Sequence, residues 1–96
     1  MSDNEFETTE IVALYLGKAF GAKQMPKIKQ LVEFLIGTSE GFDFKNTSLM
    51  NKIRELLLLN KDLAWLKTLS YNRKEFEKWI ANIKKTHGEK FKLVKA

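Results

Sequence analysis

The chain has 96 residues and a net charge of +5, with 44% hydrophobic and 11% aromatic residues. This length and composition suit one helical domain, residues 1–96, with a core of its own, and they argue against a disordered chain. Because cysteine is absent, disulfides, thiolate catalysis and cysteine-based zinc sites are excluded, and a reducing compartment fits the composition.

The charge changes sign along the chain. Residues 1–45 carry five lysines and seven acidic residues, whereas residues 46–96 carry twelve lysines or arginines and five acidic residues. This asymmetry predicts a basic face or end, although a basic excess also serves solubility alone. Residues 1–7 are predicted to be a disordered acidic N-terminus without the features of a secretory signal, and no apolar run approaches the roughly 20 residues that span a bilayer. We therefore expect a cytoplasmic protein without a membrane partner.

The first two predicted helices have clear apolar faces. One runs from about Thr9 to Phe20, is capped by Thr8 or Thr9 and ends at Gly21. The next has proline in its first turn and Gly37 just past its end, which is the usual asymmetry of helix ends. The apolar faces comprise Val12, Tyr15, Leu16 and Ala19 in the first helix, and Ile28, Leu31, Val32 and Leu35 in the second.

Two short segments show the alternation of a strand. Phenylalanines alternate with polar residues in 42–45, and apolar residues alternate with lysines in 91–94. These segments either pair as a small antiparallel ribbon or only pin two loops to the core, and both alternatives remain open.

A third predicted helix begins at Asn46 or Thr47 and has leucines on two sides, with Leu58 opposite the main apolar face. Such a helix is either central or exposes a patch for a partner. Good capping residues at 60 and 62 favour a break within residues 48–69, although one continuous helix is the alternative. Trp65 does not align with the apolar face of the segment after the break, which predicts that it is half exposed.

The last predicted helix follows a capping-box pattern, Asn72 with Glu75, and leads into a basic tail, residues 88–96. Apolar and basic side chains occupy opposite faces of this helix, so its aromatic residues are predicted to lie in the core. The apolar face comprises Phe76, Trp79, Ile80 and Ile83, and the opposite face carries Lys74, Lys78 and Lys85. The sequence thus predicts an all-α fold, a compact bundle of four or five short helices with at most one two-strand ribbon.

No pattern indicates catalysis. His87, the single histidine, has no orienting partner in the sequence and is predicted to complement the helix C-terminus. The segment GKAFGAK lacks the spacing of a phosphate-binding loop. We therefore expect a protein that is not an enzyme and has no cofactor, metal or evident small-molecule substrate.

Two binding functions remain. The first is a protein-protein interaction module of inhibitor, immunity or antitoxin, or adaptor type, which binds a protein partner or itself through Leu58 and Trp65. The alternative is a nucleic-acid-binding protein or transcriptional regulator that uses C-terminal cations. Those candidate cations are Arg73, Lys74, Lys78, Lys84, Lys85, Lys90, Lys92 and Lys95.

Overall fold

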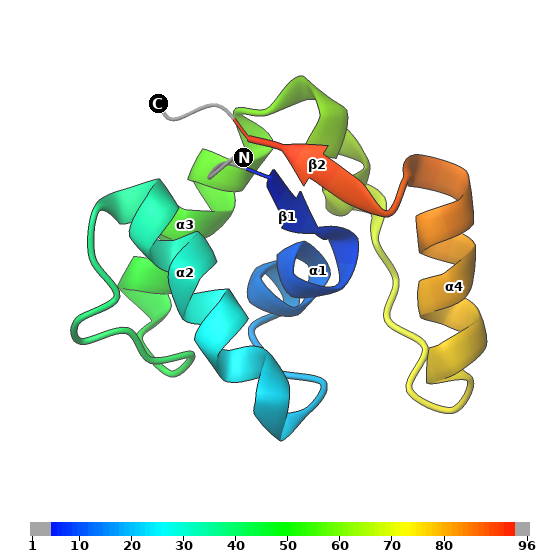
Figure 1. The fold of residues 1–96 in the computed structure, drawn as a ribbon, viewed down its shortest axis with the longest axis horizontal. Coiled ribbons are helices and arrows are strands. Elements are labelled where there is room, and N and C mark those ends of the chain that lie inside the picture. Colours follow the sequence, from blue (N-terminus) through cyan, green and yellow to red (C-terminus); the bar gives the residue numbers. More distant parts are fainter. Residues whose placement is uncertain (1–4, 94–96) are drawn as a thin grey trace.

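The computed structural model describes residues 5–93, in which short helices surround one central helix and the two ends of the described chain meet in a ribbon (Figure 1). Four α-helices and an eight-residue 3-10 helix confirm the predicted bundle. The elements are β1 (Glu5–Glu7), α1 (Thr8–Leu16), η1 (Ala22–Gln24), α2 (Met25–Ile36), α3 (Thr47–Leu58), η2 (Lys61–Thr68), α4 (Phe76–His87) and β2 (Lys90–Lys92).

The central helix is α1, whose four consecutive residues 11–14 have no exposed surface. It ends at Gly17, earlier than predicted, because Gly17 adopts a left-handed conformation (φ 78°) and its N–H donates to the carbonyls of Ala13 and Leu14. Arg54 of α3 donates from Nε to the carbonyl of Tyr15 at 2.8 Å and so stabilises this helix end. The centre of the fold is therefore α1, and not the third predicted helix.

Local end signals give the other helices their predicted bounds. Gly37 ends α2 with φ 88°, and Asn46 caps α3 by accepting a hydrogen bond from the Leu49 N–H at 3.2 Å. The predicted break after α3 is confirmed, and the segment beyond it is the 3-10 helix η2. Of the predicted apolar faces, Tyr15, Leu16, Phe76 and Trp79 are only half-buried, whereas Met50 and Leu93 are buried although no predicted helix face included them.

The predicted two-strand ribbon is present, but residues 42–45 are not one of its strands. β2 pairs antiparallel with β1, with Glu5 opposite Lys92, Phe6 opposite Phe91 and Glu7 opposite Lys90. Opposite charges and an aromatic pair face each other across the two strands, which stabilises this register. Residues 5–7 are therefore a strand and not disordered, and part of the basic tail is ordered with them.

The segment 42–45 forms no strand. The rings of Phe42 and Phe44 contact each other with centroids 5.2 Å apart and pack against the core, so they pin a loop, as the second alternative predicted. The remainder of the predicted ribbon, Val94, lies outside the described residues.

α4 stands at one side of the bundle (Figure 1). Asn72 Oδ1 accepts from the Glu75 N–H at 3.1 Å, as the capping pattern predicted, but α4 begins later than that pattern implies, at Phe76, with Glu75 as its N-cap residue and no side-chain cap. Ile80 and Ile83 are buried against the bundle. Phe76 and Trp79 instead join an aromatic cluster with Phe20 and Tyr71, with ring centroids 4.6–6.5 Å apart. Within residues 5–93, no helix is long and apolar enough to cross a membrane.

Candidate functional site

The two lysines of the ribbon face acidic residues. Lys90 and Lys92 stand directly opposite Glu7 and Glu5, and all four side chains lie on the outward face of the ribbon. Each lysine therefore has a carboxylate of opposite sign beside it, which reduces its attraction for phosphate. Both residues were predicted to contact nucleic acid, and their placement weakens that prediction.

The remaining candidate cations gather around α4 but do not form one stripe. Lys78 and Lys85 are exposed on its outer side, whereas Lys74 and Arg73 lie in the turn before the helix begins. Lys84 is half-buried and lines a cleft. Lys95, the last candidate, lies outside the described residues. The predicted alignment of three lysines along one helix is therefore wrong for its first member.

The two predicted interface residues are half-buried. Leu58 packs against the core, and Trp65 stacks on His87 with centroids 4.4 Å apart and planes inclined by 5°. The most exposed large apolar side chain of residues 5–93 is instead Leu59, at 64%. A partner contact through Leu58 and Trp65 stays a prediction, but neither side chain projects as a free anchor.

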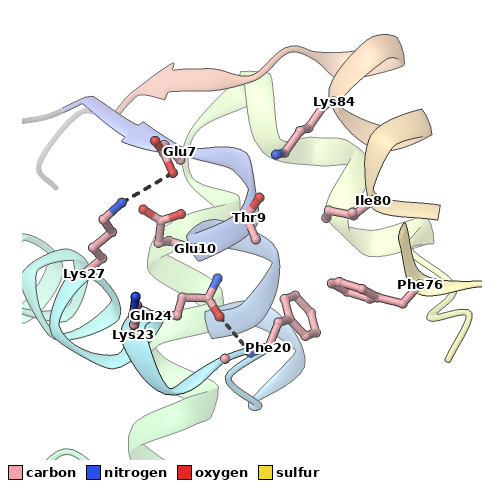
Figure 2. A pocket seen from close by; sticks show the side chains of 11 residues that line it. Glu7, Thr9, Glu10, Phe20, Lys23, Gln24, Lys27, Phe76, Ile80 and Lys84 are labelled. Carbon is pink, nitrogen blue, oxygen red and sulfur yellow. Dashed lines mark hydrogen bonds and ion pairs between the residues drawn. The ribbon is translucent and has the colours of Figure 1, made fainter. Parts of the chain in front are cut away.

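A cleft of about 610 Å³ separates α4 from the N-terminal half of the fold (Figure 2). β1 and α1 supply one wall, η1 and the start of α2 the second, and α4 the third. Its lining comprises Glu7, Thr9, Glu10, Phe20, Gly21, Lys23, Gln24, Lys27, Phe76, Ile80 and Lys84. This is the hollow in which apolar and charged groups from segments far apart in the sequence come together.

One end of the cleft is apolar. The rings of Phe20 and Phe76 face each other there with centroids 4.6 Å apart, and Ile80 lies one turn further along α4 (Figure 2). Gln24 Oε1 accepts from the Phe20 N–H at 2.7 Å and fixes the backbone of the loop that carries the ring. An aromatic pair beside an aliphatic side chain is suited to hold the apolar side chain of a ligand.

Charged groups surround the other end. Glu7 Oε2 lies 3.9 Å from Lys27 Nζ, the single ion pair among residues 5–93. Burial, and then the neighbouring Glu7 carboxylate, raise the pKa of Glu10, which favours its neutral form. Lys84 and Lys23 therefore remain as lining cations that form no ion pair within the described residues, and the cleft favours an anion beside its apolar end.

Sequence reasoning missed most of this cleft. Phe20 was placed at the end of a helix, and only Lys84 of the lining had been singled out as a functional candidate. The signal that was present is local: Phe76 and Ile80 lie one turn apart on α4, with Lys84 one further turn away. That spacing places an aromatic, an aliphatic and a basic side chain along one side of a helix.

The described residues contain no group of three or more histidine, cysteine or carboxylate side chains that could hold a metal ion. In comparisons with known proteins, no family model, no curated protein and no solved structure matches the chain.

Proposed function

We propose that the protein is a small non-enzymatic interaction module that binds a segment of a protein partner in the cleft between α1, α2 and α4. The observation that carries the proposal is the apolar end formed by Phe20, Phe76 and Ile80, next to cations that no described acidic residue neutralises. An apolar anchor with a charged group beside it is the chemistry of a peptide segment, and the cleft is open enough to admit one along its length.

The charge of the molecule supports an acidic partner. Glu5 and Glu7 of the acidic N-terminus face lysines within the ribbon, so they offer little to a basic partner. A net charge of +5 then remains to attract an anionic protein surface and to accelerate encounter with it. Inhibitors, adaptors and immunity-type proteins all act by such binding.

The proposal is tested with a variant whose larger side chain fills the cleft. Random peptides displayed on phage are selected on the wild-type protein, and the selected peptides are measured on Thr9→Trp, whose indole enters the cleft from α1. Excluding one apolar side chain should cost about 1.5–3 kcal/mol of binding free energy, a loss of more than about tenfold in affinity. The matched control is Thr47→Trp, because Thr47 is exposed on α3 away from the cleft. Equal binding by both variants would refute the proposal.

The second candidate function is binding of nucleic acid by the exposed cations near α4. Arg73, Lys74, Lys78 and Lys85 are all exposed and form no ion pair within residues 5–93, which favours contact with a phosphate backbone. Three or four such contacts on duplex DNA imply a slope of log affinity against log salt of about −3 to −4. Affinity for random duplex, measured across a salt series, tests this candidate, and the triple alanine variant of the three lysines should shallow the slope by nearly three units.

A further inference from the structure

A second hollow adjoins the cleft at its aromatic end. It has a volume of about 350 Å³ and is lined by Lys18, Ala19, Phe20, Tyr71, Arg73 and Phe76. Phe20 and Phe76 line both hollows, so the two spaces meet at this pair of rings. A ligand that crosses the rings would therefore contact both.

The charged residues that line the second hollow are both cations, Lys18 and Arg73. The Lys18 ammonium lies 4.5 Å from the centre of the Tyr71 ring, which holds it at the rim, and neither cation forms an ion pair within the described residues. An anionic group is the complement of this hollow. The planar guanidinium of Arg73 suits a carboxylate in particular, because it donates two parallel hydrogen bonds.

We propose that the partner segment is acidic on both sides of its apolar anchor, so that one carboxylate binds Lys84 in the cleft and the other binds Arg73 and Lys18 in the second hollow. This inference rests on the proposed function and specifies the class of partner: an extended acidic segment with an aromatic or aliphatic residue at its centre.

The spacing along α4 supports an extended segment. Lys84 lies four residues beyond Ile80, which is about 6 Å along a helix. Two residues of an extended chain cover about the same length, and side chains two residues apart point to the same side. An acid, an anchor and a second acid at alternate positions can therefore all face the protein. Arg73 precedes α4 by three residues and lies beyond the aromatic pair, on the opposite side of the anchor.

A single-stranded nucleic acid is the competing occupant, because it also combines rings with negative charges. One observation favours the peptide. Tyr71 already has the Lys18 ammonium over its ring and Phe20 stacked with it at 6.0 Å, so it offers no free platform for a base.

The probes are four peptides that share one anchor: acetyl-ESFSE-amide, the two forms in which one glutamate is replaced by glutamine, and the form in which both are replaced. Each exposed ion pair should contribute about threefold to affinity, so replacing both acids should weaken binding about tenfold. Arg73→Gln should weaken one of the single-acid peptides and leave the other unchanged, and Lys84→Gln should show the reverse pattern. Lys67→Gln, which removes an exposed charge on η2, should change none of them.

The outcomes separate this inference from the proposed function. If the peptides bind and only Lys84→Gln has an effect, the segment is not acidic on both sides and the inference fails, while the cleft remains a binding site. If none of the four peptides binds, the inference fails, and the proposed function fails with it if phage selection also gives no peptide that Thr9→Trp weakens. Two further outcomes would overturn the inference. The first is that acetyl-KSFSK-amide binds more tightly than acetyl-ESFSE-amide. The second is that an oligothymidylate displaces acetyl-ESFSE-amide from the wild-type protein but not from Arg73→Gln.

Discussion

Removing the Phe20 ring should weaken the attachment of α4 to the rest of the fold. Phe20 lies in the loop after α1 and contacts three aromatic side chains of α4 and the segment before it: Phe76 at 4.6 Å, Tyr71 at 6.0 Å and Trp79 at 6.5 Å. Truncation of a fully buried phenylalanine to alanine costs about 3–5 kcal/mol. Because Phe20 is only half-buried, we expect about half of that truncation cost. Each lost ring pair adds about 0.5–1.5 kcal/mol beyond the burial term. We expect Phe20→Ala to lower the free energy of unfolding by at least about 3 kcal/mol, the sum of the lower ends of these terms.

Phe42 offers a matched control. It is also half-buried and packs against the core, but its ring contacts one aromatic partner, Phe44, at 5.2 Å. Urea unfolding followed by far-ultraviolet circular dichroism should show that Phe20→Ala costs about 1–3 kcal/mol more than Phe42→Ala, because two additional ring pairs are lost. An equal or larger cost for Phe42→Ala would refute the conclusion that the aromatic cluster attaches α4.

Three further predictions concern single positions. The folded state holds the proton of Glu10 more tightly than the unfolded state, so wild-type stability should fall as pH rises from the ordinary carboxyl range through the raised pKa. Glu10→Gln removes this loss, so urea unfolding at several pH values should show that the free energy of unfolding of the variant, relative to wild type, increases with pH. A difference between the two proteins that does not change with pH would show that burial does not raise this pKa. Leu58→Lys should lower the melting temperature, because Leu58 packs against the core, whereas Leu59→Lys should leave it nearly unchanged; the opposite order would mean that Leu58 belongs to a surface patch. Gly17→Ala and Gly37→Ala should each lower the free energy of unfolding by about 1–2 kcal/mol, because both glycines have positive φ and the added Cβ at Gly17 meets its neighbours only at ordinary contact distance, whereas Gly21→Ala, at an extended φ of −170° with open space around it, should cost less; an equal cost at Gly21 would refute the conformational explanation.

Several helix ends could be predicted from the sequence because capping interactions involve only a few neighbouring residues. Pro26 and Gly37 bound α2, and Asn46 caps α3, as predicted. The first helix shows where this approach fails. The helix was predicted to end at Gly21, and the actual end at Gly17 coincides with the hydrogen bond from Arg54, which comes from a different helix.

The ribbon and the cleft depend on contacts between the two ends of the chain, and no local pattern specifies those. The alternation in residues 5–7 is too short to distinguish from a disordered acidic terminus until its partner, residues 90–92, is known. The cleft likewise requires Phe20 and Phe76 to meet, which is decided by how α4 packs. Charge reasoning identified Lys84 as a candidate nucleic-acid contact but not as part of a cleft, because helical periodicity alone does not show which neighbour a side chain faces.

The most direct test of the central claim is a nuclear Overhauser measurement between the phenylalanine ring of acetyl-ESFSE-amide and the isoleucine methyl groups of the protein. Ile80 lines the cleft, whereas Ile53 has no exposed surface and serves as the internal control. Binding in the cleft predicts cross-peaks from the peptide ring to the Ile80 methyl group and none to Ile53, and it predicts that Thr9→Trp abolishes them. A bound peptide that gives no cross-peak at Ile80, or one that persists unchanged in Thr9→Trp, would contradict the assignment of the cleft as the binding site.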